Sequence, residues 1–216
     1  MNERKEGPLV ENDMHFEVPG RWDSSMYPEI YGIPEPLLFS LAHVSRLANE
    51  KDISNSNNYD HSLDMKQFFD RASSLEKYIC AWRPPVYPPQ DEHVTEDNTL
   101  GQSPHDLLII HMITAFHKAL LIFFYRRIYD VDASILQENV RHIQYLLSQC
   151  DKFDVPAIRV ATTFVWVAFI ASCEALDLTL QNWFSDWFDT SSHKANLPVF
   201  QVVKRVIQEV WRRRNK

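Results

Sequence analysis

The chain has 216 residues, of which 45% are hydrophobic and 24% are charged, and its formal net charge is −7 at pH 7. A chain of this length and hydrophobic content can bury one substantial core, and its negative charge argues against a surface that binds nucleic acid. It contains only four glycines, which argues against sheets joined by tight turns and against Gly-rich phosphate loops. We therefore predict an all-α fold, a bundle of about seven helices without a significant sheet.

The N-terminal part of the chain begins with a polar segment and continues with two predicted helices. Residues 1–30 are polar, contain Pro and Gly and show no periodicity, so we expect a mostly disordered leader. Apolar residues at helical spacing predict a helix over Leu37–Glu50 and a second one over His61–Trp82. The stretch Asp52–Asp60, rich in Ser and Asn, is predicted to be a loop, and the acidic, proline-rich stretch 83–102 an exposed loop.

A long, nearly buried central helix is predicted next. Ser103-Pro104-His105-Asp106 has the residues of a helix start, with Ser as the N-cap and Pro at the first helical position. The apolar pattern then continues to Ile128. Asp132 can cap the following helix, which the pattern carries to Cys150.

Three helices are predicted in the C-terminal part. Pro156 opens an apolar helix that carries Trp166 and Glu174, and its apolar run is shorter than the roughly 20 residues of a membrane span, so we expect no membrane contact. A short amphipathic helix is predicted over Leu178–Phe188. The last helix begins near Pro198, and its apolar residues form two neighbouring stripes, one of Val199, Val203, Val206 and Val210 and one of Phe200, Ile207 and Trp211.

The three cysteines, Cys80, Cys150 and Cys173, are far apart in the sequence, and none belongs to a C-x-x-C spacing. The chain therefore offers neither a zinc cluster nor a redox motif. We expect reduced, buried thiols in an intracellular protein and no cofactor in this chain.

One catalytic alternative comes from the dipeptide His105-Asp106. Helical metal-dependent phosphohydrolases hold their metal with a His, a His-Asp pair and a later Asp. The remaining ligands would come from His61 or His93 and from Asp130 or Asp132. However, the Ser-Pro context already explains Asp106 as a first-turn helix residue, and we expect no enzymatic activity.

Two segments near the C-terminus carry a resemblance to a known family. The first is Trp-x-x-Phe-Ile-Ala-x-Cys-Glu at 166–174, and the second is Glu-Val-Trp-x-Arg-Arg at 209–214. Preceded by Tyr-Gly-Ile-Pro at 31–34 and Phe-Phe-Tyr-Arg-Arg at 123–127, they resemble the C-terminal part of the fungal-specific transcription factor domain. The residues that the resemblance marks as a structural signature are Trp166, Phe169, Cys173, Glu174, Glu209, Trp211 and Arg213.

The resemblance implies a helical regulatory domain over 31–216, the effector region of a fungal zinc-cluster transcription factor that controls RNA polymerase II transcription in the nucleus. It implies contacts with the transcription machinery or co-regulator proteins, with a homodimer and a small-molecule effector as further candidates. The Tyr-Gly-Ile-Pro segment resembles regulators of arginine metabolism. The family's DNA-binding module and its zinc cluster are expected to be absent from this chain, so neither direct nucleic-acid contact nor zinc is expected. A standalone helical adapter is the remaining alternative.

Glu174 ends the apolar helix, and a buried carboxylate needs a partner. The candidate partners are Arg141, Arg159 and the run Arg212–Arg214. We expect an ion pair that locks the last helix onto the bundle. Trp166, Glu174 and Trp211 are predicted to form one structural unit where the two helices meet.

Overall fold

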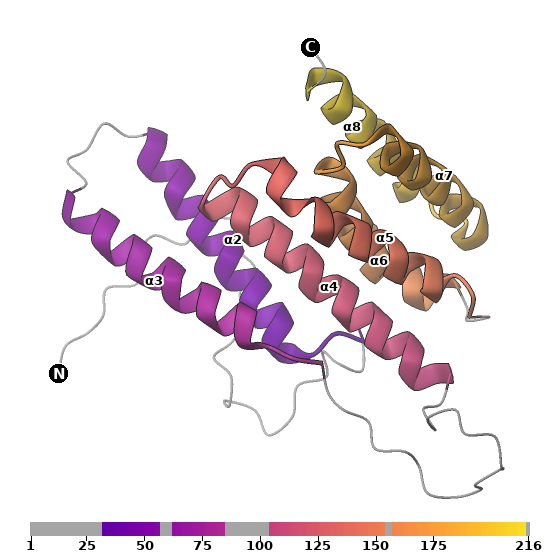
Figure 1. The fold of residues 1–216 in the computed structure, drawn as a ribbon, viewed down its shortest axis with the longest axis horizontal. Helices are drawn as coiled ribbons and strands as arrows, with labels where there is room; N and C mark the ends of the chain where they lie inside the picture. The colour runs from indigo at the N-terminus through magenta and orange to yellow at the C-terminus, as the bar shows by residue number, and fades with distance from the viewer. Residues whose placement is uncertain (1–31, 57–61, 85–103, 154–156, 215–216) are drawn as a thin grey trace, which may run out of the picture.

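Helices make up most of the residues that the structure, a computed structural model, describes: 32–56, 62–84, 104–153 and 157–214. Figure 1 shows these helices side by side, and no strand occurs in the described ranges. A single 3-10 turn, η1 (Ala133–Leu136), stands among α-helices. The α-helices are α2 (Glu35–Ser56), α3 (Ser62–Ala81), α4 (Pro104–Ile128), α5 (Gln137–Cys150), α6 (Ala157–Cys173), α7 (Leu178–Ala195) and α8 (Val199–Arg214). The predicted all-α bundle is confirmed.

α4 is the central helix of the bundle. It packs against α2 and α3 on one side and against α5 and α6 on the other. Its length and apolar composition would also suit a membrane span, and within the described ranges it is the one helix of which this is true. Because 56% of its most apolar window is buried by the neighbouring helices, its composition is that of a core helix.

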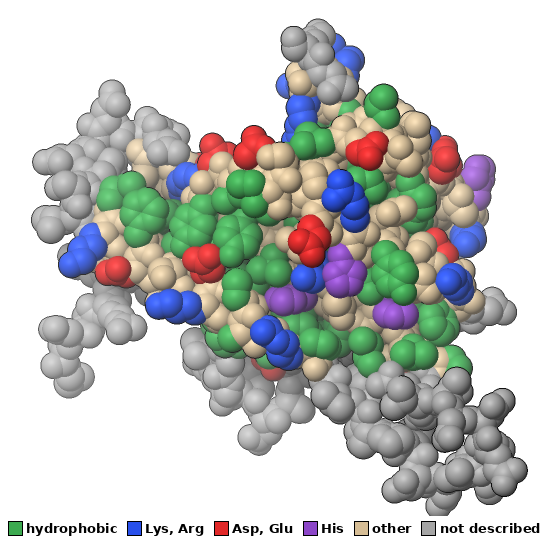
Figure 2. Space-filling view, in the orientation of Figure 1, with side chains coloured by type: hydrophobic (Ala, Val, Ile, Leu, Met, Phe, Trp, Pro, Cys, Tyr) green, Lys and Arg blue, Asp and Glu red, His purple; other side chains and the backbone are tan. Residues whose placement is uncertain are grey.

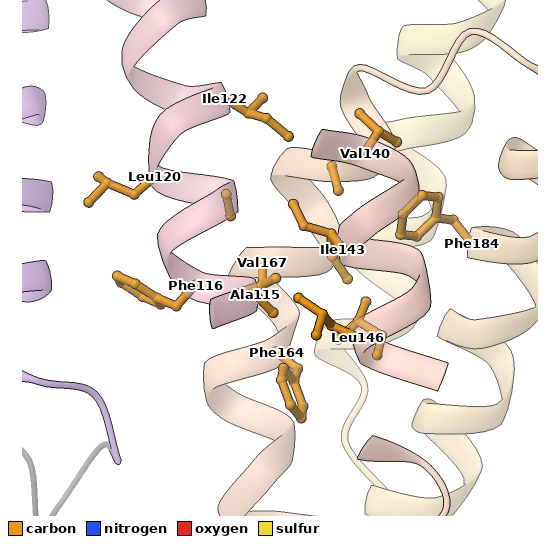
Figure 3. Close-up of a cluster of buried hydrophobic side chains, with 14 of the residues drawn as sticks. Ala115, Phe116, Leu120, Ile122, Val140, Ile143, Leu146, Phe164, Val167 and Phe184 are labelled. Atoms are coloured by element: carbon orange, nitrogen blue, oxygen red, sulfur yellow. The ribbon is translucent and has the colours of Figure 1, made fainter. Parts of the chain in front are cut away.

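The core surrounds α4: one part lies between α4, α2 and α3, and the other lies between α4, α5 and α6 and extends to the pair formed by α7 and α8. Figure 3 shows buried side chains from α4, α5, α6 and α7 in this region, with Leu120 and Phe116 pointing from α4 to its opposite side. α7 and α8 are joined by a short connection, so they form an antiparallel pair that packs on α6. The side chains labelled in the figure are Ala115, Phe116, Leu120, Ile122, Val140, Ile143, Leu146, Phe164, Val167 and Phe184.

The loop predicted from Asp52 is wrong at its start, because α2 continues to Ser56. The extension is held by contacts to the end of α4. The ammonium group of Lys51 donates to the carbonyl oxygens of Arg127 and Ile128 at 3.3 and 3.0 Å, and Asp52 forms an ion pair with Arg127. These contacts outweigh the low helix propensity of Ser and Asn, which is why local sequence signals end the helix too early.

α7 is also longer than predicted, since it runs past Phe188 to Ala195. Asp189, in the additional part, forms an ion pair with Lys204 of α8. The helix ends at Asn196, whose backbone lies in the left-handed region with φ of 51°. Asn tolerates this conformation better than most residues and commonly follows a helix C-terminus.

The other predicted helices agree with the structure to within a few residues. Asp132 does act as an N-cap, but it caps η1, with Oδ1 accepting from the Ser134 amide at 2.8 Å, and α5 follows directly. On α8, the stripe of Phe200, Ile207 and Trp211 faces the core, whereas Val199 and Val206 are exposed. The predicted leader (1–30) and nearly all of the predicted loop (83–102) lie outside the described residues.

His117 joins α4 to the C-terminal end of α3. The carbonyl oxygen of Ile79 accepts a hydrogen bond from its Nε2 at 2.9 Å, and its ring lies 4.9 Å from that of Trp82. Burial lowers the pKa of His117, and the nearby cations Lys118 and Arg83 lower it further, against the opposing effect of the Ile79 carbonyl. The folded protein therefore disfavours protonation of His117.

Acidification should weaken the folded state through His117. Its pKa is lower in the folded chain than the ordinary value of 6.5, so the stabilisation present above pH 6.5 is lost as the pH falls toward the folded pKa. His117→Gln keeps a donor for Ile79 and removes the titration. The free energy of unfolding, measured in urea from neutral to mildly acidic pH, should fall less steeply in the variant, and an unchanged slope would contradict this assignment.

Candidate functional site

The candidate site is the end of α6, where Glu174 follows the last helical residue. Only 11% of the Glu174 side chain is exposed. The position is unfavourable for a carboxylate in two ways, because burial removes its water shell and a helix C-terminus carries negative partial charge. Glu174 therefore requires cationic partners.

Two arginines from distant helices supply them. Arg126 of α4 places Nε 3.1 Å from Oε1, and Arg214 of α8 places Nη2 3.2 Å from Oε2. Each carboxylate oxygen has its own guanidinium group, so a single side chain joins α4, α6 and α8. The predicted pairing with the Arg212–Arg214 run is confirmed through Arg214, and Arg126 is an additional partner that the sequence did not indicate.

The structure describes the side chain of one of the other two predicted partners. Arg141 is exposed on α5. The side chain of Arg159 lies outside the described part of the structure. Arg126 belongs to the Phe-Phe-Tyr-Arg-Arg segment at the end of α4, but nothing in the helical spacing of that segment points to Glu174.

The last carbonyl groups around the end of α6 are satisfied by side chains of three other helices. Trp211 of α8 donates from Nε1 to the carbonyl oxygen of Ser172 at 2.8 Å. Gln137 of α5 donates to the carbonyl oxygen of Glu174 at 2.8 Å, and Gln181 of α7 donates to that of Ala175 at 2.9 Å. Carbonyl groups at a helix C-terminus have no partner within the helix, so these side chains act as its cap. We call this arrangement, with Arg126, Glu174 and Arg214, the Glu174 junction.

Arg126 also fixes the chain that leaves α4. Its Nη1 donates to the carbonyl oxygen of Val131 at 2.6 Å and lies 3.7 Å from Asp130. Asp130 has a φ of 52°, and the Val131 amide donates back to the carbonyl oxygen of Tyr125 at 3.1 Å. This hydrogen bond spans six residues and closes the end of α4 around a left-handed residue.

Trp166 lies on a different interface from Trp211. Its ring packs against Phe116 and Phe123 of α4, at centroid distances of 4.9 and 6.0 Å. The prediction of one unit is therefore right for Glu174 and Trp211 and wrong for Trp166. The physical reason is that Trp166 and Ser172 are six residues apart, which corresponds to about 600° of helical rotation, so their side chains leave α6 in different directions.

The remaining signature residues fall into two environments. Phe169 and Cys173 are half-buried on α6, and burial raises the pKa of the Cys173 thiol to about 12. Glu209 and Arg213 lie on the outer side of α8. There Glu209 accepts from Arg212 at 2.6 Å and from Arg213 at 2.7 Å, and these contacts lower its pKa to about 2.

The structure contradicts the ligand set of the metal-hydrolase alternative. His105 is exposed at the start of α4, whereas Asp130 and Asp132 follow its end, which places them about 35 Å away at about 1.5 Å per residue. His61 and His93 lie outside the described residues. Within the described ranges, no group of three or more His, Cys, Asp or Glu side chains is arranged to hold a metal ion.

The family model of the fungal specific transcription factor domain matches residues 5–216. The chain belongs to this family. Membership in the fungal-specific transcription factor domain family indicates a regulatory role in transcription, and domains of this kind are generally not enzymes. Searches of curated proteins and of solved structures find no match.

Loss of the Trp211 side chain should strongly destabilise the domain. Trp211 is buried, so we expect Trp211→Ala to lower the free energy of unfolding by about 3–5 kcal/mol. Trp211→Phe keeps most of the apolar contact but removes the indole hydrogen bond to the Ser172 carbonyl, which still accepts from the Ala175 amide, so the cost should be about 0.5–1.5 kcal/mol. The matched control is Arg213→Ala at an exposed position of the same helix, which should stay within about 0.5 kcal/mol of the parent chain. Urea unfolding measures all three, and equal stabilities for Trp211→Ala and the control would contradict the junction.

Arg126 and Glu174 should be energetically coupled. Arg126→Gln leaves the partly desolvated Glu174 with Arg214 alone, and Glu174→Gln leaves Arg126 with the exposed Asp130 alone, so the double variant should be more stable than the sum of the single losses predicts, by about 1 kcal/mol. Arg126→Gln combined with Glu209→Gln provides the control, since these two groups have different partners and should add to within about 0.5 kcal/mol. Coupling of the same size in both cycles would show that the effect is not specific to the ion pair.

Proposed function

We propose that this domain acts in the nucleus as the regulatory region of a fungal zinc-cluster transcription factor and controls RNA polymerase II transcription through contacts with co-regulator proteins or the transcription machinery. The observation that carries the proposal is the family match over residues 5–216. The Glu174 junction agrees with a regulatory role, because arginines hold both oxygens of its carboxylate and its other polar groups cap the end of α6. These groups hold the helices together and are not left for chemistry.

The distribution of positive charge supports contacts with protein over contacts with DNA. On the face in Figure 2, basic side chains gather beside the end of α8 and are elsewhere separated by acidic, apolar and neutral ones. Sequence-independent DNA binding depends on neutralising several phosphates with free basic groups. Here many of the arginines in the described ranges already contact carboxylates: Arg71, Arg126, Arg127, Arg212, Arg213 and Arg214.

A helical domain with this junction can present a fixed surface to a partner. Arg214 and Trp211 attach the C-terminal half of α8 to α6, and Lys204 attaches its middle to Asp189 of α7. A helix held on one side in this way keeps its outward face in a constant orientation, which reduces the entropy lost when a partner binds.

The chain should change transcription when it is brought to a promoter. We expect a fusion to a heterologous DNA-binding module to raise or lower reporter output severalfold in fungal cells relative to the module alone at matched expression. Trp211→Ala should abolish the change together with the fold, while the exposed substitution Lys66→Ala should leave it intact. Identical output from the fusion and from the module alone would refute the proposed function.

A further inference from the structure

The outward face of α8 carries a second apolar stripe that the bundle covers only in part. Val199, Val202 and Val206 are 45%, 47% and 46% exposed, and Val203 and Val210 are half-buried beside them. Their spacing of three and four residues keeps them on one side of the helix, over about 16 Å or roughly three turns. The opposite stripe, which contains Phe200, Ile207 and Trp211, packs against α6 and α7.

Positive charge borders the valine stripe along one edge. Arg205, Glu209 and Arg212 follow Val202 at helical spacings of three and four residues, and Arg213 lies at the end of the stripe. Glu209 is the single carboxylate between residues 199 and 214, and it is shared by Arg212 and Arg213. Arg205 is exposed and takes part in none of the ion pairs found among the described residues. This edge therefore has a surplus of positive charge on a chain whose net charge is −7.

We propose that the valine stripe of α8 is the docking surface for an acidic amphipathic helix of a co-regulator protein. This inference rests on the proposed function and names the chemistry of its partner. Apolar side chains of the partner, spaced by three and four residues, cover the valines, and its Asp or Glu side chains lie against Arg205, Arg212 and Arg213. The anchoring of α8 through Trp211 and Arg214 holds the stripe in place before the partner arrives.

The charges disfavour a second copy of the chain as the occupant. In an antiparallel pair of α8 helices, Arg212 and Arg213 of one copy would lie opposite the half of the other that carries Lys204 and Arg205. In a parallel pair, Arg213 would lie beside its own equivalent. Like charges in direct opposition weaken an interface. A nucleic acid would pair with the arginines but leave the exposed valines in water, so it uses only part of the surface.

Binding to three designed peptides tests the chemistry of the partner. Each is a fluorescent, stapled helix of about 16 residues, a length at which unstapled helices are marginal. The first has Leu and Ile at spacings of three and four with Glu on the flanks, the second replaces Glu with Lys, and the third keeps the composition of the first with its apolar positions scrambled. Fluorescence anisotropy with the full chain should show the acidic amphipathic peptide binding roughly tenfold more tightly than the other two.

Variants of α8 locate the binding surface. Val202→Asp with Val206→Asp should abolish binding while circular dichroism and thermal unfolding stay unchanged, because both side chains are exposed. Tyr145→Asp, a substitution at another exposed apolar position, is the matched control and should bind normally. Arg205→Glu with Arg212→Glu should reverse the preference in favour of the Lys-flanked peptide, which a merely structural role of α8 would not produce.

The outcomes separate this inference from the proposed function. Equal binding of the acidic and Lys-flanked peptides, no binding of the acidic peptide, or binding that survives Val202→Asp with Val206→Asp would each overturn the inference. The inference would also be overturned if the chain dimerises in analytical ultracentrifugation and Val202→Asp with Val206→Asp abolishes the dimer. Binding to duplex DNA at physiological salt that the same double variant abolishes would overturn it as well. If the reporter fusion is active and the double variant keeps full activity, the proposed function stands and the docking surface is wrong. If the parent fusion is inactive, the proposed function fails whatever the peptides show.

Discussion

The burial of one carboxylate at the end of a helix is the constraint on which this fold depends. Glu174 lies where α6 ends, so its charge meets both a low-dielectric interior and the negative end of the helix. The cost is offset only if cations reach it from elsewhere, and Arg126 and Arg214 do so from α4 and α8. The ends of three helices must therefore meet at one place. The glutamines of α5 and α7 complete the junction by capping carbonyl groups that would otherwise be buried without partners.

The part of the fold that is encoded locally could be predicted from the sequence. The limits of α4 follow from its apolar run and its first-turn proline, and the end of α5 follows from its apolar periodicity. α2 and α7 were predicted too short because the residues that extend them, such as Asp52 and Asp189, are held by partners far away in the chain. Helix propensity contains no information about such contacts, and tertiary packing regularly overrides it.

The same distinction applies to the junction. A buried Glu after an apolar run and a Trp on an amphipathic last helix are unusual enough to be noticed as residue types, and the basic end of α8 offers an obvious counter-charge. Gln137 and Gln181 could not be found in this way, because they bind backbone carbonyls and any surface helix contains glutamines like them. Arg126 could not be recognised as a partner of Glu174 for a related reason. Arginine is common in the last turn of a helix because it interacts favourably with the helix dipole, so its presence there indicates no particular contact. Trp166 shows the opposite error, in which proximity in sequence suggested a contact that helical rotation prevents.

The position of α8 in the chain has a consequence for synthesis. α4, α5 and α6 are complete before Trp211 and Arg214 are made, so a growing chain passes through a state in which Glu174 lacks Arg214 and the Ser172 carbonyl lacks its hydrogen bond from Trp211. Over the same interval, the core residues that α8 covers are open to other apolar surfaces in the cell. We therefore expect the domain to become resistant to proteolysis only once α8 has docked on α6.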